Sequence, residues 1–309
     1  MKHKKGNHAV HAVVVTYNPE YSELFSQILF LNPQVEKIWL IDNSSKIPFD
    51  KKLNALGLGG KVQLHSLAFN LGLGAAQNIG IKLAREKGAT HVLILDQDSQ
   101  PMVDMVKKLL NAIDELLSTG LSIAAVAPVY EDRIKGASSG FVRLGWFDYK
   151  KVYVSSKDDP LEVDFLISSG SLIPVEAFDV VGLIDEDLFI DHVDTEWCMR
   201  ALSKGLKLFG VPSARMIHSL GNKRKRFWFL RWRNVPYHSP FRYYYMLRNG
   251  VLLQKRPYIP WKWRIGEFMR HWQMLLFFGF WGEGSFKRLA MMLRGLRDGI
   301  KGVQGPLRD

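Results

Sequence analysis

The chain has 309 residues, enough to bury a large hydrophobic core in one large domain or two smaller ones. Its 47% hydrophobic and 23% charged residues are typical of a folded protein and exclude an intrinsically disordered chain. A single cysteine, Cys198, excludes an intrachain disulfide framework and indicates a reducing cytoplasmic compartment. No stretch reaches the roughly 18–20 apolar residues of a membrane-spanning helix.

The net charge of +12 is distributed unevenly along the sequence. Residues 224–309 hold 18 Lys and Arg against 4 Asp and Glu, whereas residues 1–223 hold 24 against 26. This asymmetry predicts a boundary near residue 220. We expect a domain of ordinary charge over 1–223 and a basic region over 224–309 that binds an anionic partner.

The first part alternates strand-like and helix-like segments. In chain order, the hydrophobic pattern predicts strands at 12–16, 37–41 and 62–67, a helix at 75–87, a strand at 91–95, a helix that Pro101 opens, a strand at 123–129, a helix from Val193 and a strand that ends at His218. This β-α alternation predicts an α/β fold with a mainly parallel sheet covered by helices on both faces.

Polar residues follow three of the predicted strands. They are Thr16-Tyr17-Asn18, Asp42-Asn43-Ser44 and Asp96-Gln97-Asp98. Ligands of parallel sheets bind at the carboxyl ends of the strands, so we expect these residues to line one pocket.

Asp96 and Asp98 are two residues apart and would project to the same side of an extended chain. Two carboxylates there repel each other unless a cation neutralises them. The alternative is a solvated turn, because Asp and Ser favour turns. His218 could complete a metal site with Asp98, although a lone histidine is more often structural.

Two further segments have both a functional and a structural interpretation. Gly72 and Gly74 precede a helix whose N-terminus favours an anion, but an isolated G-x-G more often belongs to an ordinary loop. Asp191 and Asp194 lie near the start of the next predicted helix. Acids there stabilise the helix dipole, or one of them is a general base.

Taken in order, the motifs resemble glycosyltransferase family 2 of the GT-A fold, and most closely its bacterial rhamnosyltransferase branch. The motifs are VVVTYNPE, LIDNSS, FNLGLGAAQNIG, LILDQDS, SSGSLIP and FIDHVDTEWCMRA, and the resemblance spans residues 10–220, with a weak extension to RYYYMLRN near residue 242. It implies a Rossmann-like, mainly parallel sheet with flanking helices, followed by a basic, aromatic, helical C-terminal region.

The resemblance also implies site residues. The nucleotide-sugar site would contain Thr16, Tyr17, Asn18, Asp42, Asn70, Gly74, Asn78, Asp96 and Gln97. Asp96, Asp98 and His218 would hold Mg²⁺ or Mn²⁺, and the loop Ser168, Ser169 and Gly170 would lie where donor sugar and acceptor meet.

The family's acceptor base falls on Asp194, within an acidic set that also contains Asp191 and Glu196. The acid that precedes the base in the family is Val193 here, so Asp191 stays open as the alternative base. One base without a second nucleophile implies a single displacement with inversion.

The implied reaction transfers L-rhamnose from dTDP-β-L-rhamnose to a lipid-linked saccharide of O-antigen or another bacterial cell-surface polysaccharide. UDP-galactofuranose, UDP-glucose or UDP-GlcNAc are alternative donors within the family. A non-catalytic sugar-nucleotide-binding scaffold at the membrane is the alternative of another class.

Six of the nine tryptophans lie in residues 224–309, interleaved with Arg and Lys. This composition is typical of a segment in the interface of an anionic membrane, so we expect a peripheral protein on the inner face of the bacterial inner membrane. Internal packing or a homodimer is the first alternative. Nucleic acid is a weaker one that we do not expect.

Overall fold

The computed structural model describes residues 8–47, 60–132, 140–145, 149–218, 224–229, 231–236, 238–280 and 285–308, together with residues 50, 53 and 57. For residues 132, 149, 224–229, 231–236, 279 and 280 the description covers the backbone alone. The side chains of Trp228, Trp232 and Trp281, which belong to the predicted membrane segment, therefore lie outside it.

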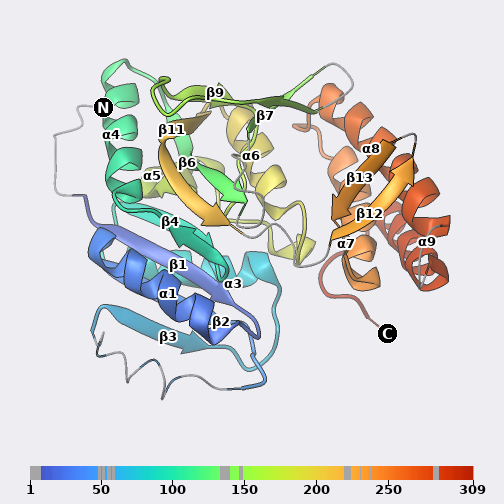
Figure 1. Cartoon of the computed structure of the whole chain (residues 1–309), viewed down its shortest axis with the longest axis horizontal. Helices are drawn as coiled ribbons and strands as arrows, with labels where there is room; N and C mark the ends of the chain where they lie inside the picture. Colours follow the sequence, from blue (N-terminus) through green and yellow to red (C-terminus); the bar gives the residue numbers. More distant parts are fainter. Residues whose placement is uncertain are drawn as a thin grey trace.

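A nine-stranded sheet forms the centre of the first part (Figure 1). The strands follow the order β3-β2-β1-β4-β10-β6-β11-β5, and β9 pairs with β11. Their bounds are β1 Val10–Thr16, β2 Lys37–Asp42, β3 Val62–Ser66, β4 His91–Asp96, β5 Ser99–Pro101, β6 Ile123–Asp132, β9 Leu161–Val163, β10 Leu172–Pro174 and β11 Lys207–His218. Strands β1 to β4 pair in parallel, as do β6 and β11, whereas β5, β9 and β10 run antiparallel to their neighbours.

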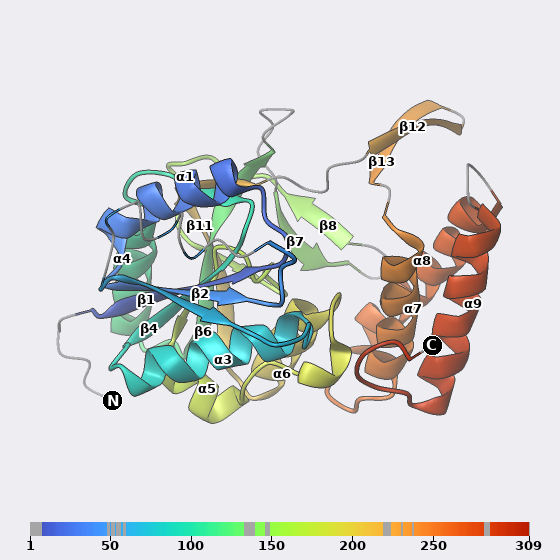
Figure 2. The same ribbon diagram turned by 90° about the horizontal axis from the view of Figure 1, so that it is seen from below.

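Helices cover both faces of this sheet (Figure 2). Helices α1 (Tyr21–Leu31) and α4 (Met105–Ser118) pack on one face through apolar side chains such as Ile28 and Leu109. On the other face lie α3 (Leu73–Glu86), α5 (Val175–Val181) and α6 (Val193–Ser203). Two 3₁₀ turns, Asn32–Gln34 and Glu186–Leu188, complete the layers. The sheet is thus buried on both sides, as the near-continuous apolar strands require.

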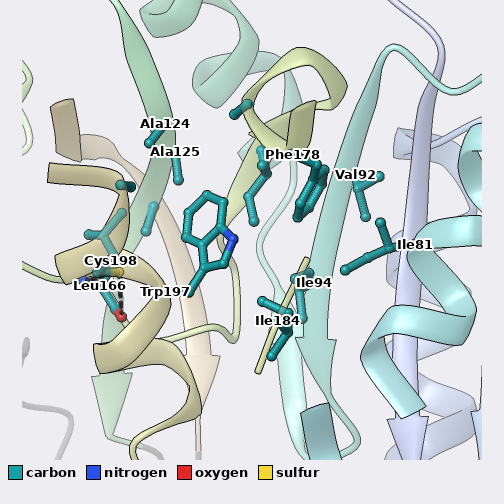
Figure 3. Close-up of a cluster of buried hydrophobic side chains, with 14 of the residues drawn as sticks. Ile81, Val92, Ile94, Ala124, Ala125, Leu166, Phe178, Ile184, Trp197 and Cys198 are labelled. Carbon is teal, nitrogen blue, oxygen red and sulfur yellow. Dashed lines mark hydrogen bonds between the residues drawn. The ribbon is translucent and has the colours of Figure 1, made fainter. Parts of the chain in front are cut away.

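The hydrophobic core on the face covered by α3, α5 and α6 contains Trp197, whose ring lies 5.7 Å from that of Phe178 (Figure 3). Cys198 lies in the same core, and its Sγ–H points to the carbonyl of Leu166 at 3.7 Å. Burial raises the pKa of the Cys198 thiol to about 12, so the thiol is protonated at neutral pH.

The sequence prediction that Pro101 opens a helix is wrong, because Ser99–Pro101 form the edge strand β5 and α4 begins at Met105. Proline is compatible with an edge strand, where its missing N–H has no ladder bond to make. In this pairing Pro101 lies opposite Met216 and Ser99 lies opposite His218. The edge strand therefore brings the end of β11 to the acidic loop after β4.

The C-terminal part contains α7 (Pro240–Gln254), α8 (Trp261–Phe280) and α9 (Ser285–Lys301), which stand beside the α6 end of the sheet domain (Figures 1 and 2). Two antiparallel strands, β12 (Arg224–Phe229) and β13 (Arg231–Pro236), precede them where the sequence predicts a helical region. A smaller pair, β7 (Phe141–Leu144) and β8 (Tyr149–Val152), belongs to the first part. The predicted boundary near 220 falls in 219–223, outside the described residues. Among the helices described, none combines the length and apolarity needed to cross a bilayer.

Candidate active site

The carboxyl ends of β1, β2 and β4 meet at one rim of the sheet, as the strand-end pattern predicts. Thr16 donates its hydroxyl to Asp42 Oδ1 at 2.9 Å, and the Ser45 N–H donates to Asp42 Oδ2 at 3.1 Å. Asp42 is buried, and these donors hold its carboxylate in one orientation at the rim.

Tyr17, Asn18 and Gln97 lie on the same rim. Gln97 Oε1 accepts the backbone N–H of Tyr17 at 2.8 Å and so ties the end of β1 to the acidic loop after β4. Asn18 has a positive φ of 47°, and its Oδ1 accepts the N–H of Lys46 at 2.9 Å. The structure therefore brings these residues together from three strand ends.

Asn70 orders the segment before α3. Its Oδ1 accepts Nδ2 of Asn43 at 3.0 Å and the N–H of Gly72 at 2.9 Å. Asn43 in turn accepts the N–H of Leu71 at 2.9 Å. Asn43 is buried and directly follows Asp42 at the end of β2, among the strand-end residues that the sequence predicts at this rim.

Gly72 and Gly74 allow close approach of neighbouring segments of the protein. A Cβ on Gly72 would lie 2.6 Å from Cδ2 of Phe189, and one on Gly74 would lie 2.8 Å from the carbonyl oxygen of Asp185. Asn78 donates to the carbonyl of Ile184 at 2.9 Å. Gly74 and Asn78 thus contact the segment after α5, and the nucleotide contact that the resemblance implies for them stays a prediction.

Asp96, Asp98 and His218 form a potential metal site, because each offers a ligand atom within 4.8 Å of the others. Ser99 Oγ lies 2.7 Å from His218 Nδ1 and 2.6 Å from Ser169 Oγ, so a hydroxyl network orients the imidazole. Two carboxylates and one imidazole are a donor set that fits Mn²⁺ or Mg²⁺.

Asp96 lies where the charges of the site converge. Burial raises its pKa to about 6, and the charges of Asp98 and Asp194 act in the same direction, whereas His218 and Arg242 oppose them. The carboxylates from the end of β4 and from the start of α6 are therefore close enough to repel each other.

The loop at Ser168, Ser169 and Gly170 connects these two groups. Ser169 Oγ accepts the N–H of Asp96 at 3.0 Å, and the N–H of Gly170 donates to the carbonyl of Ile94 at 2.7 Å. The backbone of Ser168 donates to the Asp194 carboxylate. This loop thus contacts both Asp96 and Asp194.

The three acids that the sequence offers as candidate bases differ in their surroundings. Asp191 is ion-paired with Arg242, whose Nε donates to Asp191 Oδ2 at 3.2 Å. Asp194 is half-buried, and burial raises its pKa although the backbone N–H of Thr195 donates to Oδ1 at 2.7 Å.

Glu196, the third candidate acid, is 0% exposed. Its Oε1 and Oε2 accept from Arg200 at 2.8 and 2.9 Å, and Oε1 also lies 3.1 Å from Arg256. The Glu196 carboxylate is thus engaged by two guanidinium groups and joins α6 to the C-terminal part, so the structure does not support its inclusion among the candidate bases.

Arg242, in the first turn of α7, is a functional candidate that the sequence analysis missed. Burial lowers its pKa, but Asp191, Asp96 and Asp194 together outweigh burial and raise it. A guanidinium from the C-terminal part thus faces three acids of the first part. The only sequence signal was the weak extension of the resemblance into RYYYMLRN.

The segment of residues 187–192, which we call the 187–192 turn, has an unusual backbone. Phe189, Asp191 and His192 have φ values of 64°, 63° and 62°. Each such conformation costs a non-glycine residue about 1–3 kcal/mol, so neighbouring structure must stabilise this turn.

A cavity of about 330 Å³ adjoins the 187–192 turn. It lies between this turn, β7 and the helices α7 and α8, and it is lined by Val142, Phe165, Asp191, His192, Thr195, Met246, Trp263, Glu267 and Arg270. Apolar walls with a few convergent polar groups are typical of a small-ligand site.

Comparison with known sequences identifies the family. The family model "Glycosyl transferase family 2" matches residues 12–182. The chain is also 36% identical over 255 residues to dTDP-rhamnosyl transferase RfbF of Shigella flexneri, which covers 82% of each protein. The chain belongs to glycosyl transferase family 2.

Solved structures are similar in fold. GalNAc-T7 with UDP, GalNAc and Mn²⁺ superimposes with a TM-score of 0.59 at 20% identity, over 86% of this chain and 56% of that one. Staphylococcus aureus TarS 1–349 in complex with UDP-GlcNAc superimposes with a TM-score of 0.58 at 16% identity, over 95% of this chain and 81% of that one. The chain therefore has the GT-A glycosyltransferase fold, and the acids at the end of β4 form the D-x-D motif of the family.

The metal site generates a prediction. Asp98→Asn should weaken Mn²⁺ binding by at least about tenfold because it removes a charged ligand. In the unchanged protein, Mn²⁺ affinity should fall as the pH drops from 7 to 5, since Asp96 with its pKa of about 6 takes up a proton that competes with the ion.

Isothermal titration calorimetry measures both effects. Asp104→Asn, the same change at an exposed acid outside the group, is the control. Equal Mn²⁺ affinity in Asp98→Asn and in the control would contradict the site.

Proposed function

We propose that the chain is a metal-dependent, inverting rhamnosyltransferase that moves L-rhamnose from dTDP-β-L-rhamnose to a hydroxyl of a lipid-linked saccharide. The observation that carries this proposal is the half-buried Asp194, with its raised pKa, beside the D-x-D acids and the Ser168–Gly170 loop. The donor assignment is supported by the 36% identical dTDP-rhamnosyl transferase.

Donor binding would use the strand ends. Asp42 would accept an N–H of the pyrimidine base, since its carboxylate is already oriented by Thr16 and Ser45. Asp96, Asp98 and His218 would hold Mg²⁺ or Mn²⁺, which when bound offsets the negative charge of the diphosphate leaving group.

Asp194 is better suited than Asp191 to be the base. The Asp191 carboxylate is occupied by the Arg242 guanidinium, whereas Asp194 accepts only neutral donors among the hydrogen bonds described: the backbone N–H groups of Thr195 and Ser168 and, at 3.5 Å, the Thr195 hydroxyl. A raised pKa makes a carboxylate a stronger base near neutral pH. Asp194 would take the proton of the acceptor hydroxyl as that oxygen attacks the anomeric carbon, and a single displacement inverts the configuration.

The cavity beside Asp191 and Thr195 would receive the acceptor saccharide. The aromatic rings of Phe165 and Trp263 offer apolar surface, while Glu267 and Arg270 offer hydrogen-bonding groups. Its position next to the residues that flank Asp194 supports this assignment.

The donor assignment predicts which nucleotide stabilises the protein. With Mn²⁺ present, dTDP and dTDP-rhamnose should raise the thermal midpoint more than UDP, UDP-GlcNAc, UDP-glucose or UDP-galactofuranose. A thermal-shift panel measures this at equal ligand concentrations. A larger shift with a UDP-sugar would replace the rhamnose assignment with the alternative that TarS, solved with UDP-GlcNAc, represents in the same fold.

The base assignment predicts the effect of Asp194→Asn. Transfer should fall by at least about 1,000-fold, because the variant has no group that accepts the proton, while dTDP binding stays within threefold. In the unchanged enzyme kcat should decline on the acid side, and the decline should begin at a higher pH than for an ordinary aspartate because the pKa of Asp194 is raised.

Rates of dTDP release with acceptor, measured between pH 5 and 8, test both statements. Glu196→Gln is the control, because it neutralises a buried acid that takes no part in the proposed reaction. The stability of this variant is measured together with its rate. Full transfer by Asp194→Asn would remove the base assignment.

We also propose that the C-terminal helices bind the inner face of the bacterial inner membrane, where a lipid-linked acceptor would be met. Residues of α8 at helical spacing are exposed and apolar: Trp261 (51%), Phe268 (51%), Trp272 (51%) and Leu276 (59%). Residues 261–301 contain eight Lys and Arg against three Asp and Glu. An apolar stripe on a basic helix pair suits an anionic bilayer surface.

This proposal predicts that Trp272→Asp weakens binding to vesicles of anionic phospholipid by at least about tenfold, because it places a charge in the apolar stripe. Vesicle co-sedimentation measures the effect, and Phe30→Asp, at an exposed aromatic residue of α1, is the control. Equal binding of both variants would contradict the proposal. A dimer in lipid-free solution that Trp272→Asp dissociates would instead assign the stripe to a second copy of the chain.

A further inference from the structure

The strained backbone of the 187–192 turn leads directly into α6, and the turn ends two residues before Asp194. The described hydrogen bonds from other elements that hold this turn come largely from α7.

Asn249 makes the densest set of these contacts. Its Nδ2 lies 2.9 Å from the carbonyl oxygen of Leu188, 2.8 Å from that of Ile190 and 2.9 Å from that of Asp191. The side chain is 0% exposed, so no water replaces these donors. One amide group thus contacts three carbonyl oxygens. These oxygens would point in different directions if the segment were extended or helical.

Arg248 fixes the orientation of that amide. Its Nε donates to Asn249 Oδ1 at 2.9 Å, which leaves the Asn249 NH₂ facing the turn. Its Nη2 donates to the carbonyls of Asp187 and Leu188 at 3.2 and 3.0 Å. The guanidinium also lies 4.6 Å from the ring centroid of Tyr245, which packs it in place.

Further contacts come from other elements. Glu267 of α8, 1% exposed, lies 3.2 Å from His192 Nε2. The N–H of Leu73, at the start of α3, donates to the carbonyl of Phe189 at 2.6 Å, and the N–H of Gly305 donates to the carbonyl of Asp187 at 2.7 Å. The turn is therefore held between the donor-side segment and the C-terminal helices.

We propose that Asn249, oriented by Arg248, is a positioning residue that holds the 187–192 turn in the one conformation that presents Asp194 to the acceptor. Asn249 contacts backbone carbonyls of the turn, so it acts through the turn and not on the substrate. This inference rests on the proposed function, in which Asp194 is the base. It makes α7 a part of the catalytic machinery and not only a support for membrane binding.

The test is Asn249→Asp, which keeps the size of the side chain but replaces two N–H donors with an anion facing three carbonyl oxygens. We expect kcat to fall about 100-fold, the loss typical of a small displacement of a reacting group, while the donor KM stays within threefold. Gln254→Glu, the same chemical change at the end of α7, is the matched control and should keep kcat within twofold.

Asn249→Ser, which retains one hydroxyl donor, is the second variant in case Asn249→Asp does not fold. It should give a smaller loss of kcat with the same unchanged donor KM. The proposal is overturned if the folded variant keeps kcat within threefold. It is also overturned if the affinity for the nucleoside diphosphate of the donor falls as far as kcat, because Asn249 would then support the fold in general.

The comparison uses whichever nucleotide sugar the unchanged enzyme turns over, so an error in the rhamnose assignment leaves the test intact. If Asp194→Asn keeps full activity in the same assay, the base assignment fails separately from the role of Asn249.

Discussion

Mutual repulsion among carboxylates is the constraint on which this structure depends. Asp96, Asp98, Asp191 and Asp194 come from two distant segments and meet at one rim of the sheet. Such a group is stable only if positive charge is placed among them. Arg242 at the start of α7 supplies part of it from the protein, and His218 at the end of β11 offers a further ligand for a cation. Both residues lie at the site because the C-terminal helices and the edge strand β5 bring them there.

The C-terminal region therefore has an inner and an outer side. Its inner side reaches the acids through Arg242, contacts the strained turn through Asn249, and lines the cavity through Met246 and Trp263. Its outer side exposes the apolar residues of α8. The charge and tryptophan content of the sequence predicts only the function of the outer side. It does not predict the contacts of the inner side, because composition carries no information on which buried polar group binds which carbonyl.

Much of the first part was predictable. Apolar runs located β1, β2 and β4, and the polar residues at their ends meet as parallel pairing requires. What the sequence could not predict was non-local: β5 is a strand because it pairs with β11, and the close approach of Phe189 and Asp185 to the glycines before α3 arises only in the tertiary fold. Glu196 resembled a catalytic acid in sequence, yet its partner Arg256 lies in a segment that only the tertiary fold brings near.

The buried thiol of Cys198 has a practical consequence for the study of this enzyme. With a pKa of about 12, it is inert to maleimides and iodoacetamide under native conditions, and the chain has no other cysteine. A reporter cysteine introduced at the cavity rim or along the outer face of α8 would carry all of the label. Acceptor docking and bilayer depth can thus be followed with fluorescent or spin labels without first removing the native cysteine.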